Sequence, residues 1–268
     1  MLNSYYRYRQ ALNRKQSLFL SFFSKKRQKL IKIHLYNQTF HFYTNTSDFD
    51  SIRQNLNRDY RFSRYAPPTT LLKNIMGDAE KQKTIVDVGA YIGASMLFFK
   101  TLFPDSQVVG VEPDLRNFQL LNLNLGHLSN FKVFNKILSP KLYYINKSND
   151  PNRIKKGTTL DFWVKQFDNG EDSKIERISG RDLIDLLETD YVDILKISCE
   201  TMTSVVLDDF LSTGRVKAVA VSVRTRLMEN HLGQILQILN KHGRLSLEFD
   251  CTLNGSVIWN YPVYRERV

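Results

Sequence analysis

The chain has 268 residues, of which 42% are hydrophobic and 24% charged, as in an ordinary soluble globular protein. That length suffices for one large domain with its own core. A membrane-spanning helix is excluded, because no apolar run comes near the roughly 20 residues that one requires. The formal net charge is +11, and it is unevenly placed: residues 1–66 hold 13 lysines and arginines against 3 acidic residues, whereas residues 67–268 hold 25 against 24. The basicity therefore belongs to the N-terminal part.

Residues 1–29 form a basic leader that we expect to be helical. Tyrosines and arginines open it, the apolar run LFLSFF follows, and four basic residues close it. No small-residue cleavage site follows that run, so a signal peptide is not indicated. Three roles stay open: packing on the main domain, association with an anionic membrane surface or a glycan, and contact with nucleic acid, which no recognised nucleic-acid module supports.

Two short elements are predicted between the leader and the main domain. Residues 32–44 alternate between apolar and polar around Asn37-Gln38, which favours a β-hairpin. Ser47 then precedes a helix that runs to about Asn57. Pro67-Pro68 marks a joint, and we divide the chain there into an N-terminal appendage, 1–66, and one domain, 67–268. A further helix is expected at about 69–76.

A βαβ unit forms the centre of the sequence. The pattern predicts a buried strand at Thr84–Val88, a tight turn at Gly89–Gly93 and a helix at Ala94–Phe103. A second strand at Gln107–Glu112 follows, and Asp114 caps the next helix, which ends near residue 125. Ligands of open parallel sheets bind beyond the carboxyl ends of the strands, so this turn is the predicted binding site.

The glycine turn does not match a dinucleotide fingerprint. The pattern G-x-G-x-x-G requires glycine at positions 89, 91 and 94, where this chain has Gly89, Tyr91 and Ala94. Tyr91 fills the position where the backbone must approach a pyrophosphate, and Asp87 adds negative charge beside it. Neither objection applies to S-adenosylmethionine, which carries a sulfonium and an ammonium and has no phosphate.

Each polar group near the turn then has an expected partner on that cofactor. We expect Asp87 to serve the cationic methionine end and the N–H groups of residues 93–95 to face the ligand carboxylate. Glu112, at the end of the second strand, is expected to accept hydrogen bonds from both ribose hydroxyls. One alternative stays open: Asp87 caps the helix and Gly89 only turns the chain.

The second half of the chain continues the sheet. Strands are predicted at 131–138, 192–197 and 216–225, and Ser179 is predicted to cap a helix over 180–187. A helix at 229–242 precedes a hairpin that turns at Asn254-Gly255. The polar stretch 141–172 is long enough for a functional flap. Cys199 and Cys251 lack His or Cys neighbours at ligand spacing, which indicates a reduced, cytoplasmic compartment and no zinc site.

Three stretches resemble the FkbM family of S-adenosylmethionine-dependent methyltransferases: DVGAYIG, VGVEPDLRNFQLLNLN and YVDILKISCE. The resemblance runs from about Lys32 to the C-terminus. It implies an α/β, Rossmann-like class I methyltransferase sheet in the order 3-2-1-4-5-7-6 with the last strand antiparallel. It also implies an acceptor hydroxyl on a sugar of a glycan or on a secondary metabolite. The implied cofactor-binding residues are Asp87, Gly89, Ala90, Tyr91, Gly93, Glu112, Pro113 and Asn135, the last beside the adenine.

The end of the fourth predicted strand departs from the family pattern K-I-D-V-E-G-A-E. Lys196 and Glu200 are kept and are the predicted catalytic pair, but the first acid is replaced by Ser198 and the last by Thr203. The fifth strand likewise ends in Ser222 and Arg224, which with Ser198 form the predicted substrate set. Two explanations stay open: the pocket binds a different acceptor, such as an anionic one, through Arg224 and Lys196, or catalysis is lost and a binding fold remains.

Overall fold

The computed structural model describes just over half of the chain: residues 30–35, 38–43, 48–56, 65–67, 71, 82–139, 176–199, 202–223, 228–244, 247–252 and 255–260. The basic leader, the polar stretch 141–172 and, apart from Leu71, the helix expected at 69–76 lie outside these residues. So do Glu200 and Arg224.

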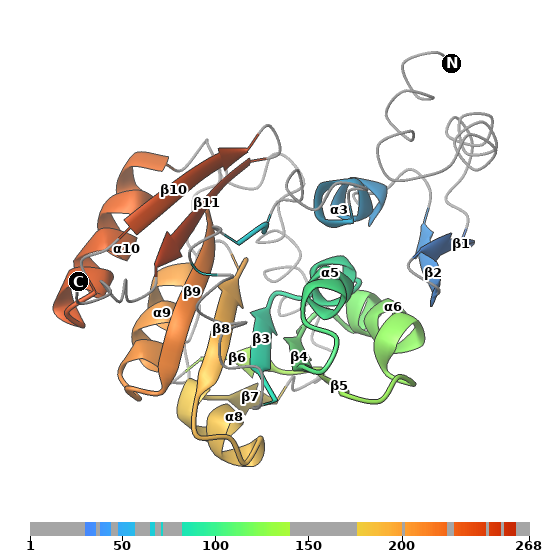
Figure 1. Cartoon of the computed structure of the whole chain (residues 1–268), viewed down its shortest axis with the longest axis horizontal. Coiled ribbons are helices and arrows are strands. Elements are labelled where there is room, and N and C mark those ends of the chain that lie inside the picture. The colour runs from blue at the N-terminus through green and yellow to red at the C-terminus, as the bar shows by residue number, and fades with distance from the viewer. Residues whose placement is uncertain are drawn as a thin grey trace, which may run out of the picture.

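Five apolar strands lie parallel in the centre of the molecule, and a C-terminal hairpin extends the sheet (Figure 1). The order is β10-β11-β9-β8-β3-β4-β5, with β11 antiparallel to both β9 and β10. Numbered along the chain, this is 3-2-1-4-5-7-6 with the last strand antiparallel, so the predicted class I methyltransferase sheet is confirmed. The strands are β3 (Thr84–Val88), β4 (Gln107–Val111), β5 (Phe131–Phe134), β8 (Val192–Ile197), β9 (Val216–Val223), β10 (Leu247–Thr252) and β11 (Gly255–Asn260).

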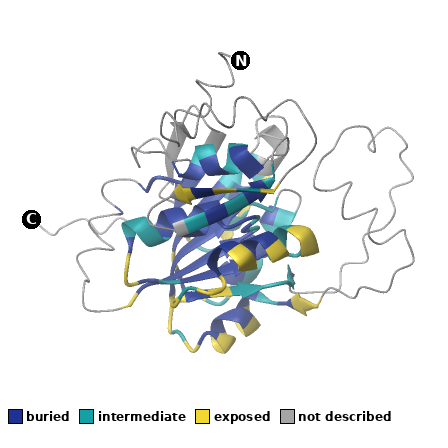
Figure 2. Cartoon of the chain, turned by 90° about the vertical axis from the view of Figure 1, so that its right-hand side faces the viewer, coloured by how far each residue is buried: buried dark blue, intermediate teal, exposed yellow. Residues whose placement is uncertain are grey.

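Helices cover both faces of the sheet because successive strand residues point to opposite sides. In β3, Ile85 belongs to one apolar core, whereas Val86 and Val88 belong to the other. The first core includes α3 (Asp48–Asn55), α5 (Ala94–Leu102) and α6 (Leu115–Leu125), and the second includes α8 (Gly180–Leu186), α9 (Thr203–Leu211) and α10 (Met228–Lys241). Figure 2 shows the sheet and the inner sides of these helices as buried. None of the helices in the described ranges is long and apolar enough to cross a membrane.

The N-terminal hairpin shares a core with the sheet. It consists of β1 (Leu30–Leu35) and β2 (Gln38–Tyr43), which pair antiparallel. Phe40 and Phe42 are almost fully buried and belong to the same apolar cluster as Phe98 and Phe99 of α5. The described part of 1–66 is therefore packed on the α5 side of the sheet, while the division of the chain at residue 66 stays a prediction.

The strand predicted over 131–138 is divided in two. β5 ends at Phe134, and β6 (Ile137–Leu138) pairs with β7 (Arg177–Ile178) in a separate parallel sheet. The ladder between β4 and β5 ends where the Glu112 N–H donates to the Phe134 carbonyl at 3.0 Å. The Asn135 amide donates to the carbonyls of Glu112 and Pro113, at 3.0 Å each.

Both predicted hairpin turns lie one residue too late. The register pairs Leu35 with Gln38 and Thr252 with Gly255, so Gln38 and Gly255 already belong to strands. The predictions relied on turn-forming residue pairs, whereas register is set by which side chains each strand buries. The hairpins themselves are confirmed.

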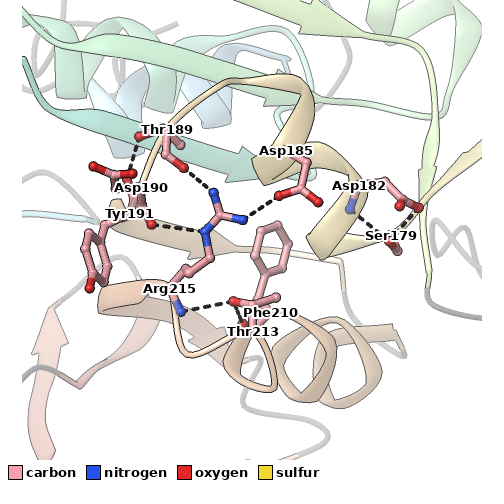
Figure 3. Close-up of polar contacts among 9 residues, drawn as sticks. All are labelled: Ser179, Asp182, Asp185, Thr189, Asp190, Tyr191, Phe210, Thr213 and Arg215. Atoms are coloured by element: carbon pink, nitrogen blue, oxygen red, sulfur yellow. Dashed lines mark hydrogen bonds and ion pairs between the residues drawn. The ribbon is translucent and has the colours of Figure 1, made fainter.

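Arg215 connects three segments at the amino edge of the sheet, where the parallel strands begin (Figure 3). Its guanidinium donates to the carbonyls of Asp190 and Thr189 and forms an ion pair with Asp185 of α8. Its backbone N–H donates to the Thr213 hydroxyl at 3.1 Å. One side chain thus joins the end of α8, the loop before β8 and the start of β9.

Candidate cofactor site

The glycine turn lies at the carboxyl edge of the sheet, and close packing requires its glycines. Gly89 has φ +75°, and a Cβ there would lie 2.4 Å from the carbonyl oxygen of Ser198. Gly93 has φ +92°, and a Cβ there would lie 2.6 Å from Leu125 Cδ1. Both positions therefore need glycine whether or not a ligand binds, because φ is positive and a side chain has no room.

Asp87 and Lys196 form a buried ion pair beneath the turn. The register places Asp87 of β3 opposite Lys196 of β8, and their side chains are 0% and 3% exposed. Lys196 Nζ lies 2.6 Å from Asp87 Oδ1 and donates to the Gly89 carbonyl at 3.0 Å. Ser95 donates to Asp87 Oδ2. Burial raises the pKa of Asp87, while Lys196 and Ser95 act against that rise.

The structure gives both residues protein partners, and their predicted roles toward a ligand stay predictions. Both Asp87 oxygens have partners, and the side chain is shielded from solvent. The Lys196 ammonium, expected in catalysis or acceptor binding, lies under the turn and 5.1 Å from the centre of the Tyr65 ring. A cation held in this way stabilises the turn, and the predicted catalytic role of Lys196 stays a prediction.

Glu112 follows β4 directly, and three donors orient its carboxylate. Oε2 accepts from the Tyr91 N–H at 2.8 Å, and Oε1 accepts from the Asp114 N–H at 3.1 Å and from Asn117 Nδ2 at 3.3 Å. Burial nevertheless raises the pKa of Glu112 to about 7. A carboxylate has about four acceptor positions, so these partners leave one on Oε2 for a ligand. A second becomes open if a ligand replaces Asn117, the most distant donor.

Tyr91 connects the turn to the N-terminal helix. Its φ is +55°, in the left-handed region that non-glycine residues seldom adopt. Its hydroxyl donates to Asp48 Oδ1 at 2.6 Å, while its N–H is bonded to Glu112. Ala90, also predicted in the site, is buried and donates its N–H to the Val111 carbonyl at 3.2 Å.

The remaining predicted cofactor residues lie around the same edge. The amide of Asn135 is oriented by its two carbonyl acceptors, which leaves its Oδ1 without a partner in the described part of the chain. Gly93 N–H donates to Ala90 O, so it is taken by the turn itself. The N–H groups of Ala94 and Ser95, at the start of α5, have no backbone acceptor among the described residues.

The predicted acceptor side is described only in part. Ser198 and Ser222 are half-buried and follow the buried stretches of β8 and β9, and Ser198 donates its N–H to the Val88 carbonyl at 2.9 Å. The Cys199 Sγ lies 3.9 Å from the Thr203 hydroxyl. Because Glu200 and Arg224 lie outside the described residues, their predicted roles stay predictions.

Sequence reasoning missed two residues that hold the site, Asp48 and Asn124. Asp48 follows Ser47 at the predicted start of a helix, and no pattern linked it to the glycine turn. Asn124 is 1% exposed, and its amide bonds both the His41 backbone and the Ile92 carbonyl. A signal did exist for Asn124, since it lies between Leu121 and Leu125 on the apolar side of its helix.

Comparisons with known proteins find distant similarities to solved structures. No protein-family model and no curated protein sequence matches it. Among solved structures, it is similar to precorrin-6y C5,15-methyltransferase from Geobacter metallireducens, at 12% identity over 79% of this chain and 91% of that chain, TM-score 0.42. M. jannaschii TYW2 in complex with AdoMet matches at 11% identity over 88% and 86%, TM-score 0.42. Human methyltransferase-like protein 13 with SAH matches at 16% over 74% and 79%, TM-score 0.43. These TM-scores are low, and the fold assignment rests on the strand order.

Proposed function

We propose that this chain is an S-adenosylmethionine-dependent O-methyltransferase related to the FkbM family, acting on a hydroxyl of a glycan sugar or a secondary metabolite. The observation that carries the proposal is Glu112, which follows β4 and lies against the glycine turn with an acceptor position left on Oε2. A carboxylate at this place in a class I sheet suits a pair of ribose hydroxyls.

The charges at the turn favour this cofactor over a dinucleotide. The Lys196 ammonium neutralises the Asp87 carboxylate. The Glu112 carboxylate, once ionised, therefore gives the described residues around the turn a net negative charge. A pyrophosphate would be repelled there, whereas a cationic ligand would be attracted. Tyr91 also occupies the place where a dinucleotide needs glycine.

Different groups of the chain contact different parts of the cofactor in this proposal. Glu112 accepts from the ribose, the N–H groups of Ala94 and Ser95 face the carboxylate end, and Asn135 Oδ1 accepts from the adenine amino group. When bound, S-adenosylmethionine supplies an activated methyl group that a nucleophile displaces from the sulfonium. Positioning provides much of the acceleration of such an in-line displacement.

Glu200 is the proposed base that orients or deprotonates the acceptor hydroxyl. Lys196 lies in a buried ion pair, so among the predicted catalytic residues Glu200 carries this role alone. We expect Glu200→Gln to retain cofactor affinity and to lose about 10²-fold or more in turnover, within the usual range for a positioned acid or base. Turnover at the parental rate, with unchanged stability, would remove Glu200 from the mechanism.

A second candidate function is a non-catalytic protein that binds adenosyl ligands. The observation that favours it is the placement of Lys196 under the turn, together with serine at 198 and 222 where the family has acids. Mass spectrometry of glycans and metabolites, from cells with and without the protein, distinguishes the two. A methylated species that depends on the protein supports the enzyme; binding of S-adenosylhomocysteine without any such species supports the second candidate.

For the basic leader we propose a cytoplasmic, membrane-peripheral role. The support is its charge, since residues 1–66 hold nearly all of the net +11. Sedimentation of the full chain with vesicles that contain anionic lipid should weaken as salt is raised, and deletion of residues 1–29 should reduce it. Sedimentation that does not change with salt concentration would favour packing of the leader on the domain.

A further inference from the structure

The N-terminal helix α3 supplies a carboxylate to the glycine turn. Asp48 is the first residue of α3 and is only 3% exposed. Its Oδ1 accepts from the Tyr91 hydroxyl at 2.6 Å, and its Oδ2 accepts from the Tyr43 N–H at 2.7 Å. The end of β2, the start of α3 and the turn therefore meet at one buried carboxylate.

Tyr91 has two contacts that point in opposite directions. Its hydroxyl reaches Asp48, and its backbone N–H donates to Glu112 Oε2 at 2.8 Å. The backbone between them is left-handed, a conformation that a residue such as tyrosine keeps only where its surroundings impose it. The direction of the N–H depends on this conformation, so the contact that anchors the ring also helps to aim the N–H at Glu112.

A second connection joins the same hairpin to the same turn. Asn124 of α6 accepts from the His41 N–H at 2.6 Å and donates to the carbonyls of His41 and Ile92, at 3.0 Å each. Ile92 follows Tyr91 in the turn. Arg116, also on α6, stacks on the Tyr43 ring at 4.6 Å. Two sets of contacts thus hold the hairpin and α3 against the residues around Glu112.

We propose that Asp48, acting through Tyr91, is a positioning residue that aims Glu112 at the ribose hydroxyls. The N-terminal hairpin and α3 are then part of the cofactor site and set its preference for ligands with an intact ribose. This inference rests on the proposed function, because it takes the ribose as the partner of Glu112. Asp48 itself touches no reacting atom.

The proposal makes a selective prediction. Without its hydroxyl, residue 91 loses Asp48, its N–H is no longer held toward Glu112, and the carboxylate loses its only described donor on Oε2. Ligands that bond Glu112 should then bind more weakly, whereas the affinity of ligands without ribose hydroxyls should not change. A contact that only stabilised the fold would affect both kinds of ligand alike.

The test measures calorimetric binding of S-adenosylhomocysteine and of its 2′,3′-dideoxy analogue to the full chain. Tyr91→Phe should bind S-adenosylhomocysteine about tenfold more weakly and the analogue within about twofold of wild type, as expected for one lost hydrogen bond near a charged acceptor. Tyr191→Phe is the matched control: it is the same chemical change at an exposed position before β8, and it should alter neither affinity.

Asp48→Ala, which removes the acceptor of the Tyr91 hydroxyl, should show the same selective loss if Asp48 acts through Tyr91, and circular dichroism establishes that each variant is folded. Equal losses for both ligands, or no loss for either, in Tyr91→Phe would overturn the inference while leaving the cofactor assignment intact. Failure of wild type to bind S-adenosylhomocysteine would overturn the proposed function and, with it, this inference.

Discussion

The ion pairs of Arg215 and of Lys196, which lie at opposite edges of the central sheet, differ in how far they are exposed. At the amino edge, Arg215 and Asp185 are 31% and 58% exposed, and the guanidinium is surrounded by carbonyls that water also reaches. At the carboxyl edge, Asp87 and Lys196 are buried against each other, and Glu112 is buried with no cationic partner among the described residues. Burial makes each charged group at the carboxyl edge costly. Titratable groups with shifted pKa values cluster at functional sites, which supports the proposal that the cofactor binds at the carboxyl edge.

Removal of the Lys196 ammonium should have the largest effect on stability. We expect Lys196→Met to lower the free energy of unfolding by about 3–5 kcal/mol, because Asp87 is left buried and uncompensated. Urea unfolding at neutral pH measures the change. The double variant Asp87→Leu with Lys196→Met is the control and should recover much of the loss, since apolar pairs often replace buried ion pairs. A Lys196→Met variant as stable as wild type would mean that the pair is not buried as described.

The pKa of Glu112 should produce the next largest effect, as a dependence of stability on pH. Burial raises this pKa from 4.5 to about 7, so the folded state binds the proton more tightly than the unfolded state. The contribution of Glu112 to stability is therefore fully present below pH 4.5 and is lost as the pH rises through 7. Over that window wild type should lose about 3 kcal/mol relative to Glu112→Gln.

Urea unfolding of both proteins at a series of pH values measures this difference. The buried carboxyl of Asp87 also has a raised pKa, but it is present in both proteins and cancels in the comparison. Stability curves that run parallel from pH 4.5 to pH 7 would show that Glu112 is not desolvated.

At the amino edge, the corresponding substitution should cost less. Arg215→Met removes an exposed ion pair, worth about 0–1 kcal/mol, and hydrogen bonds to carbonyls that water can replace. We expect a loss of about 1–2 kcal/mol in the free energy of unfolding and unchanged affinity for S-adenosylhomocysteine. Arg215→Lys keeps the charge but not the planar fork, so its free energy of unfolding should lie between those of wild type and Arg215→Met. A loss of stability as large as that of Lys196→Met would contradict the difference between the two ion pairs.

Local patterns were sufficient for the elements that frame the site. The bounds of β3 and β8 follow from short apolar runs, and Asp114 caps α6 as predicted by accepting from the Asn117 N–H at 2.7 Å. Ser179 likewise caps α8. These features depend on residues close in sequence, which is why periodicity and cap preference found them.

The contacts that define the site depend on register and packing between distant segments. Lys196 meets Asp87 only because β8 pairs with β3 in one register, and Asp48 meets Tyr91 only because α3 packs on α5. No local pattern encodes either encounter. The need for glycine at 89 is similar: its cause is the Ser198 carbonyl, more than a hundred residues away.

The most direct test of the account is calorimetry of S-adenosylhomocysteine and NAD with wild type and Glu112→Ala. Wild type should bind S-adenosylhomocysteine and show no comparable affinity for NAD, because the turn offers negative charge and a tyrosine where a pyrophosphate needs room. Glu112→Ala should bind S-adenosylhomocysteine more weakly by about 2–4 kcal/mol, the loss expected for hydrogen bonds to a charged acceptor. Equal affinity of wild type and Glu112→Ala, or preference of wild type for NAD, would contradict the assignment of this edge to S-adenosylmethionine.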